Sequence, residues 1–174
     1  EIDAKLRRYD AHASELVHEA VVADLLAGKN IALVSDAGTP GVSDPGVLLV
    51  ARVREAGARI EVIPGPSAVT AAVSLAGFTG NQFTFLGFAP QKKGRQTFFE
   101  SLATWPHPVV FFESTHRIVK ALETLAAVMP TTPVYVAREL TKLHEECLTG
   151  TAAEVVEILT TEPVKQKGEF VIIV

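Results

Sequence analysis

The chain alternates short apolar runs with stretches in which apolar residues recur every three or four positions. Residues 14–27 show this helical spacing, and Gly28 follows as a typical helix stop. Residues 31–34 and 60–63 are apolar runs of the kind that form buried parallel strands. Each run is followed by a loop rich in Gly and Pro and then by another helical pattern. The first half therefore predicts strand–loop–helix units with a parallel sheet.

The loop signals of the first half also place helix starts and a linker. Asp44 is predicted to cap a helix with Pro45 at its first position, and residues 67–75 form the next predicted helix. Residues 77–83 contain glycines and no periodic pattern, so we interpret them as a linker. This divides the chain into two predicted α/β domains, residues 1–80 and residues 81–174.

The second half has the same mixture of strand and helix patterns. Strands are predicted at residues 83–86, 109–112, 134–137 and 170–174. Helices are predicted at residues 95–103 and from Ser114 or Thr115 onward. Thr151 with Glu154 three residues later is a capping box that predicts a further helix.

Composition narrows the class of protein. The 174 residues are 48% hydrophobic and 21% charged, with a net charge of −4 and a single cysteine. Cys147 cannot form an internal disulfide, which favours a reducing, cytoplasmic home, and no apolar run reaches the length of a membrane helix. The mild acidity argues against a general polyanion binder but allows a local basic patch.

Because the chain begins with Glu1 and no opening strand, we expect an N-terminal piece to be absent from this sequence.

The most informative stretch for function is the loop of residues 35–46. It follows a predicted strand and precedes a predicted helix, which is where open α/β sheets bind ligands. Its glycines allow close approach of a ligand, while Asp36 and Asp44 add acceptors that suit a cationic or hydroxyl-rich ligand. The glycine spacing matches neither a P-loop nor a dinucleotide fingerprint. A plain turn explains the same residues equally well.

Other strand ends carry polar residues with both a functional and a structural interpretation. Residues 64–68 form a helix start whose free amides could meet a ligand. Residues 113–117 and 137–146 are polar or charged, as solvated loops and capped helices usually are. Residues 91–95 form a basic loop that serves solubility or contacts phosphate. Histidine and cysteine spacing indicates neither a metal site nor a nucleophile.

Six ordered motifs lie along nearly the whole chain. They are Val34-Ser-Asp-Ala-Gly-Thr-Pro-Gly-Val-Ser-Asp-Pro-Gly46, Ile63-Pro-Gly-Pro-Ser-Ala68, Phe85-Leu-Gly-Phe88, Phe111-Phe-Glu-Ser-Thr-His-Arg117, Ala137-Arg-Glu-Leu-Thr-Lys142 and Lys167-Gly-Glu-Phe170. Together these motifs closely resemble the bacterial 16S ribosomal RNA ribose 2′-O-methyltransferases of the tetrapyrrole methylase superfamily.

This resemblance implies two α/β domains with S-adenosylmethionine in the cleft between them, and homodimers. It implies a cytidine ribose in the decoding region of 16S rRNA, within the small ribosomal subunit, as the substrate. The residues that it places at the cofactor are Asp36, Thr39, Ser67, Ala68, Phe112, Ala137 and Gly168. The family's opening strand and Gly-containing loop are absent from this sequence.

Methyl transfer to a hydroxyl is helped by a group that removes or polarises the proton. The candidates at predicted strand ends are Glu113, Glu139, Lys142 and His144, of which we select Glu113 and Lys142 as catalytic. The predicted RNA-binding residues are Lys92, Lys93, Arg95 and Arg117. A tetrapyrrole (precorrin) C-methyltransferase and a non-catalytic RNA- or ligand-binding module remain alternatives.

Overall fold

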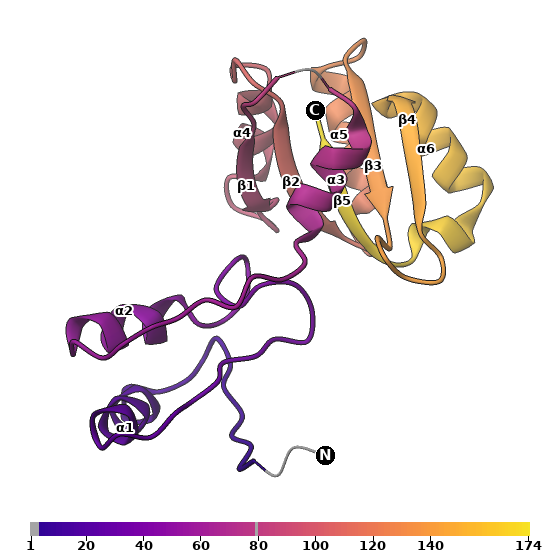
Figure 1. The fold of residues 1–174 in the computed structure, drawn as a ribbon. Coiled ribbons are helices and arrows are strands. Elements are labelled where there is room, and N and C mark those ends of the chain that lie inside the picture. Colours follow the sequence, from indigo (N-terminus) through magenta and orange to yellow (C-terminus); the bar gives the residue numbers. More distant parts are fainter. Residues whose placement is uncertain (1–3, 79) are drawn as a thin grey trace. The chain divides into compact units, whose positions relative to one another are not determined.

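A computed structural model describes residues 4–78 and 80–174 of the chain. The chain divides into two compact units, Glu1–Ser67 and Ala68–Val174, which Figure 1 shows coloured along the sequence. Each unit is described by itself below.

The first unit contains helices α1 (Glu15–Leu26) and α2 (Val47–Glu55), which contact each other. Guanidinium Nη2 of Arg52 on α2 lies 3.1 Å from Oε1 of Glu15 at the start of α1. His18 is the buried residue of α1, and its Nε2 lies 3.0 Å from the hydroxyl of Tyr9. These polar contacts help to fix the two helices beside the N-terminal segment.

The predicted strands at residues 31–34 and 60–63 are wrong for the described part of this unit. Both segments lack a strand partner, and Val34 and Ile63 are 78% and 85% exposed. A strand is stable only when a neighbouring strand satisfies its backbone groups, and none of the described residues of this unit supplies that neighbour. The parallel sheet predicted for the first half is therefore not formed here.

The predicted cap of α2 is also wrong. The helix begins at Val47 with Gly46 as its N-cap, so Asp44 and Pro45 lie before it. Gly46 has a φ of +136°, and a Cβ there would lie 2.8 Å from Cδ2 of Leu33. The close approach of Leu33 and the left-handed backbone explain why the helix starts after a glycine and not at the aspartate.

The second unit is built on a five-stranded sheet with the order β1-β2-β5-β3-β4. Only β1 and β2 run parallel to each other, and the remaining neighbours pair antiparallel. The strands are β1 (Thr84–Phe88), β2 (Val109–Ser114), β3 (Pro133–Arg138), β4 (Glu146–Thr151) and β5 (Glu169–Ile173). The helices are α3 (Ala68–Ala76), α4 (Arg95–Leu102), α5 (Ile118–Val128) and α6 (Ala152–Thr161), followed by the 3₁₀ turn η1 (Pro163–Gln166).

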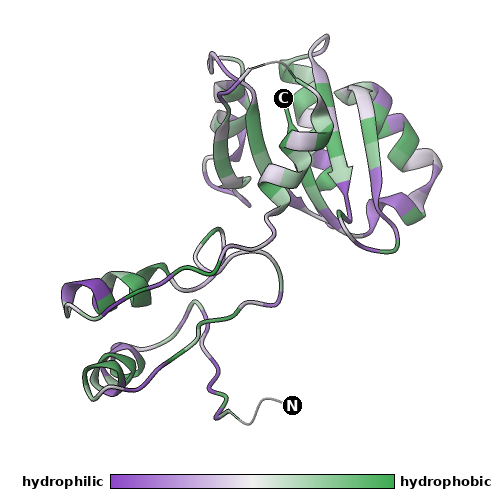
Figure 2. Cartoon of the chain, in the orientation of Figure 1, coloured by the Kyte–Doolittle hydropathy of each residue, from purple (hydrophilic) through white to green (hydrophobic). Residues whose placement is uncertain are grey.

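Successive residues of the strands face opposite sides of the sheet and feed two separate cores. Phe111 and Ile172 pack with α4, α5 and α6 on one face. Val110 and Val171 pack with Val69 of α3 on the other face. Figure 2 shows apolar residues concentrated along these strands and on the helix surfaces against them. Among the residues described, no helix is long and apolar enough to cross a membrane.

Most elements predicted for the second half are confirmed, including four of its strands and the capping box at Thr151. Strand β4 was not predicted because it contains no apolar run, Leu148 being its one buried residue. Helix α3 packs on β5 and so groups with the second unit. The domain boundary at residues 80 and 81 stays a prediction.

Candidate functional site

Motifs that are far apart in the sequence meet at one edge of the sheet in the second unit. β1, β2 and β3 end at this edge and β5 begins there, because β5 runs antiparallel to its neighbours. Phe170 stands in register with Glu113 on one side and with Arg138 on the other. The segments 113–117, 138–142 and 167–169 therefore surround the same end of the sheet.

Glu113 is a buried carboxylate held by arginines from two elements. Its Oε1 accepts hydrogen bonds from Nε of Arg117 at 2.7 Å and from the backbone N–H of Ser114 at 2.8 Å. Its Oε2 lies 2.9 Å from Nη1 of Arg95. Burial of this charge is tolerable because two cations compensate it. Glu113 thus ties the start of α4 and the turn before α5 to the end of β2.

Arg95 also fixes the loop that precedes α4. Its Nη1 donates to the carbonyl of Pro90 at 2.9 Å, and its guanidinium lies 5.0 Å from the ring centre of Phe99. The Arg95 side chain is only 13% exposed. Arg95 and Arg117, both predicted to contact RNA, are therefore committed to Glu113, whereas Lys92 and Lys93 are exposed and form no described ion pair.

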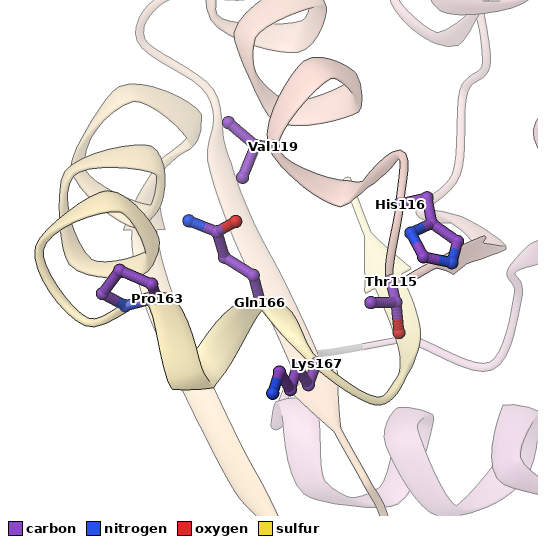
Figure 3. Close-up of a pocket in the computed structure, with 6 residues that line it drawn as sticks. All are labelled: Thr115, His116, Val119, Pro163, Gln166 and Lys167. Atoms are coloured by element: carbon purple, nitrogen blue, oxygen red, sulfur yellow. The ribbon is translucent and has the colours of Figure 1, made fainter.

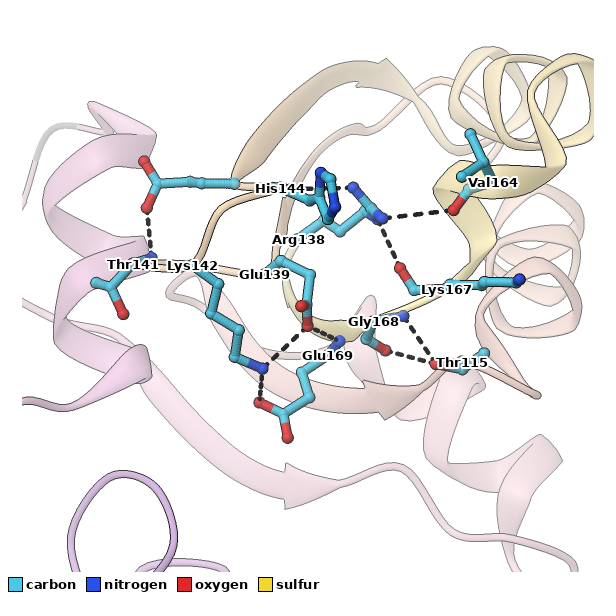
Figure 4. Close-up of polar contacts among 11 residues, drawn as sticks. Thr115, Arg138, Glu139, Thr141, Lys142, His144, Val164, Lys167, Gly168 and Glu169 are labelled. Atoms are coloured by element: carbon cyan, nitrogen blue, oxygen red, sulfur yellow. Dashed lines mark hydrogen bonds and ion pairs between the residues drawn. The ribbon is translucent and has the colours of Figure 1, made fainter.

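Arg138, at the end of β3, is buried and forms hydrogen bonds to the segments around this end of the sheet. Its Nε donates to the carbonyl of Lys167 at 2.7 Å, and Nη1 donates to the carbonyl of His144 at 3.0 Å. A longer contact of 3.4 Å joins Nη2 to the carbonyl of Val164. One side chain thus connects the loop after β3 to the segment before β5, as Figure 4 shows.

A charged cluster lies beside Arg138 in the same view. Nζ of Lys142 lies 3.0 Å from Oε1 of Glu139 and 2.9 Å from Oε2 of Glu169 (Figure 4). The backbone N–H of Glu169 donates to Glu139 Oε1 at 2.8 Å and is the main reason that the pKa of Glu139 is lowered. Hydrogen bonds to Glu169 and Glu139 raise the pKa of Lys142. Lys142 is therefore suited to donate a hydrogen bond and poorly suited to accept a proton.

Gly168 is enclosed by side chains from both neighbouring motifs. Oγ1 of Thr115 donates to its carbonyl at 2.7 Å and accepts from its N–H at 2.9 Å. Gly168 has a φ of +124°, and a Cβ would lie 2.5 Å from Cγ of Glu139. Only glycine fits this position without displacing Glu139.

A cavity of about 420 Å³ opens next to this contact (Figure 3). Its lining comes from the start of α5 and from the segment that includes η1. The lining residues are Thr115, His116, Val119, Pro163, Gln166 and Lys167.

The predicted cofactor residues of the second unit lie on the α3 side of the sheet and at its edge. Phe112 and Ala137 flank Val171 in register, and all three belong to the same apolar cluster. Ala137 is fully buried, while the Phe112 ring packs edge-on against Phe85 with centres 5.0 Å apart. Ala68 is the exposed first residue of α3.

The other predicted cofactor residues lie in the first unit, where two of the predicted ligand loops touch. Thr39 Oγ1 donates to the carbonyl of Pro66 at 3.5 Å, which links the loop of residues 35–46 to residues 64–67. Asp36 is exposed and has no described hydrogen-bond or ion-pair partner. Ser67 is half-buried, and its side chain or backbone is already engaged in an interaction within the protein.

Sequence reasoning did not select Arg138 or Thr115 for this site. Both belong to the ordered motifs of the sequence. Arg138 directly follows the predicted strand 134–137, and Thr115 stands at the predicted start of a helix, and these positions were the available signal. Their roles depend on backbone carbonyl and amide groups of residues 144, 164, 167 and 168, which only the folded sheet brings close.

Comparison with known proteins identifies the family. Residues 3–156 match the family described as Tetrapyrrole (Corrin/Porphyrin) Methylases. Ribosomal RNA small subunit methyltransferase I of Xylella fastidiosa strain Temecula1 is 43% identical over 99% of this chain and 64% of its own length. The protein of that name from Escherichia coli O157:H7 is 41% identical over 99% of this chain and 61% of its own length. The chain thus spans less than two thirds of these relatives.

Solved structures agree on the fold. Cobalt precorrin-4 methyltransferase superposes with a TM-score of 0.66 at 19% identity, over 94% of this chain and 72% of that one. Uroporphyrin-III C-methyltransferase from Thermus thermophilus, complexed with S-adenosyl homocysteine, gives a TM-score of 0.58 at 18% identity over 92% of this chain and 72% of that one. From the family match over most of its residues, the chain belongs to the tetrapyrrole (corrin/porphyrin) methylases.

Proposed function

We propose that the full-length protein is an S-adenosylmethionine-dependent methyltransferase that acts on RNA of the small ribosomal subunit. The observation that carries this proposal is the 40–43% identity, over nearly the whole chain, to relatives named ribosomal RNA small subunit methyltransferase I. The finer proposal is that the methyl group goes to the ribose 2′-oxygen of a cytidine in the decoding region of 16S rRNA. The resemblance of the ordered motifs supports that choice.

The residues proposed to hold S-adenosylmethionine fit such a ligand within each unit. In the first unit, a Cβ added at Gly38 or Gly65 would meet nothing within 4 Å, so a ligand can approach the backbone there. The uncommitted carboxylate of Asp36 suits the positive charges of the sulfonium and amino groups. In the second unit, the partly exposed ring of Phe112 offers an apolar surface, whereas Ala137 is fully buried beside it and Gly168 has both backbone groups paired with Thr115. When bound, this cofactor supplies an electrophilic methyl group.

For the chemistry, we propose that Lys142 acts as a cation near the ribose and not as a base. Its pKa is raised by Glu169 and Glu139, so it stays protonated at neutral pH. Lys142 can then donate a hydrogen bond to an oxygen of the substrate while Glu139 fixes its direction. Glu113, the other catalytic candidate, is enclosed by two arginines, and this geometry favours a role in positioning the surrounding loops.

For RNA contact, we propose that Lys92 and Lys93 meet phosphates beside the target nucleotide. Both side chains are exposed on a loop whose base is anchored by Arg95 and Glu113. A local basic patch is needed because the chain as a whole carries a net charge of −4.

We further propose a homodimer that acts in the cytoplasm, where bacterial small subunits are assembled. Light scattering of the full-length protein tests the dimer.

The decisive experiment supplies the full-length protein with tritiated S-adenosylmethionine and separate acceptors. These are small ribosomal subunits from a strain that lacks the corresponding gene, protein-free 16S rRNA, and a precorrin. Methyl transfer to subunits or rRNA supports the proposal. Transfer to the precorrin alone would replace it with a tetrapyrrole methyltransferase, and cofactor-independent RNA binding without any transfer would replace it with a binding module.

The cofactor site has its own test in isothermal titration calorimetry of the full-length protein. Asp36→Ala is expected to weaken S-adenosylmethionine binding because it removes the free carboxylate. Glu19→Ala is the matched control, because Glu19 is an exposed acidic residue of α1 in the same unit, with no described ion pair and outside the two predicted ligand loops. Equal affinities for both variants would remove Asp36 from the proposed site.

A further inference from the structure

The cavity of about 420 Å³ beside α5 has a lining unlike the rest of this acidic chain. Its lining contains a lysine and a histidine but no aspartate or glutamate. Val119 and Pro163 add apolar surface, and Gln166 and Thr115 add polar surface. Such a cavity matches a ligand that combines negative charge with a flat or apolar part.

The two basic side chains of this cavity are not used inside the protein. Nζ of Lys167 and the imidazole of His116 have no ion-pair or hydrogen-bond partner among residues 4–78 and 80–174, and both side chains are exposed. By contrast, Arg95, Arg117, Arg138 and Lys142 at the same edge are all committed to carboxylates or carbonyls. Lys167 and His116 are therefore free to meet an anion from outside.

The backbone that carries these groups is firmly held. The carbonyl of Lys167 accepts from Arg138, and the side-chain amide of Gln166 donates to the carbonyl of Leu159 at 2.8 Å. Thr115, next to His116, is joined to Gly168 by two hydrogen bonds. Figure 3 shows the segment 163–167 on one side of the cavity and the start of α5 on the other. The walls are thus preorganised, which lowers the entropic cost of binding.

We propose that this cavity binds a nucleotide of the RNA substrate that flanks the methylated one. Its phosphate would meet Lys167 and His116, and its sugar or base would lie against Val119 and Pro163. This inference rests on the proposed function, because it assumes RNA as the substrate. It adds a second contact point to Lys92 and Lys93, which follow β1 at the same edge of the sheet.

The test compares Lys167→Ala with Lys120→Ala in the full-length protein. Lys120 is a matched control, because it is an exposed lysine on α5 that has no described ion pair and does not line the cavity. We expect Lys167→Ala to raise the KM for small ribosomal subunits about ten- to hundredfold, as loss of a hydrogen bond to a charged group does. The logarithm of the binding constant should also decrease less steeply with the logarithm of the salt concentration, by about one unit of slope. Lys167→Arg should bring the KM for small ribosomal subunits most of the way back to that of the unmodified protein. In both Lys167 variants the affinity for S-adenosylmethionine should not change.

Several results would overturn the proposal. Equal KM values for Lys167→Ala and Lys120→Ala would show that the cavity does not contact the substrate. Loss of S-adenosylmethionine affinity in Lys167→Ala would assign the residue to the cofactor site. Failure of the proposed function itself is distinguishable, because the unmodified protein would then transfer no methyl group to small subunits or rRNA.

Discussion

Gly168 and Glu139 lie so close that a single Cβ on the glycine would stand 2.5 Å from Cγ of the glutamate. This contact joins the segment before β5 to the loop after β3. Glu139 in turn accepts from the backbone N–H of Glu169 and pairs with Lys142. The absence of a side chain at residue 168 therefore sets the position of the charged cluster at the edge of the sheet.

Gly168→Ala should lower the free energy of unfolding by about 1–3 kcal/mol, because it combines a strained backbone with a steric overlap. Gly80→Ala is the control. Gly80 has a φ of +134° but nothing within 4 Å of a Cβ, so it carries the backbone strain alone. Urea unfolding of both variants measures the difference. Equal losses would mean that the Glu139 contact does not constrain residue 168.

The ionised form of Glu139 should stabilise the fold. Its pKa is lowered by the Glu169 amide and by Lys142, so this stability is present above the unfolded value of 4.5 and is lost as pH falls through the folded pKa. The stability difference between the unmodified chain and Glu139→Gln should therefore shrink as acid is added below about pH 4.5. Unfolding curves at a series of pH values check this. A difference that stays constant with pH would contradict the assignment.

Glu113→Gln should be strongly destabilising, because it leaves Arg95 and Arg117 without their shared carboxylate. Breaking a buried ion pair by removing one partner costs about 3 kcal/mol or more. Glu123→Gln, an exposed glutamate on α5 with no described ion pair, serves as the control. Chemical unfolding compares the two variants. A Glu113→Gln protein as stable as the control would show that the arginines find other partners.

The basic residues of the loop should have two different roles. Lys92 and Lys93 should bind RNA, and Arg95 should hold the loop in place. Lys92→Ala combined with Lys93→Ala should raise the KM for small ribosomal subunits and leave the melting temperature unchanged. Arg95→Ala should lower the melting temperature, because its guanidinium contacts Glu113, Pro90 and Phe99. Kinetics and thermal unfolding of both variants test this division. A double lysine variant with unaltered kinetics over a range of salt would show that the loop is only solvated surface.

The pattern of residues was sufficient to predict most of the second unit. Strand β2 opens with the run Val109-Val-Phe-Phe112, and β3 contains Val134-Tyr-Val-Ala137, so both carry apolar residues on both faces. Thr151 with Glu154 marks the start of α6 by local hydrogen bonds alone. Edge strand β4 has no such run, because only one of its residues, Leu148, is buried. Local patterns report apolar runs and capping. The other edge strand, β1, has such a run in Phe85-Leu86 and was predicted, whereas β4 has none.

The same patterns failed where structure depends on partners distant in the chain. Residues 31–34 and 60–63 have the composition of buried strands, but composition supplies no neighbour to pair with. The motifs at the site were visible in the sequence, whereas the contact of Arg138 with three carbonyls was not. Nor could the sequence show that Arg95 and Arg117 share one carboxylate, because their pairing requires the end of β2 to lie between them.

The position of the transferred methyl group tests the central claim most directly. Small subunits methylated by the full-length protein with labelled S-adenosylmethionine can be digested to nucleosides and analysed by mass spectrometry. We predict a single product, cytidine with the methyl group on its ribose 2′-oxygen, from an RNA fragment of the decoding region. A methyl group on a base, on another nucleoside, or on no RNA at all would contradict the account.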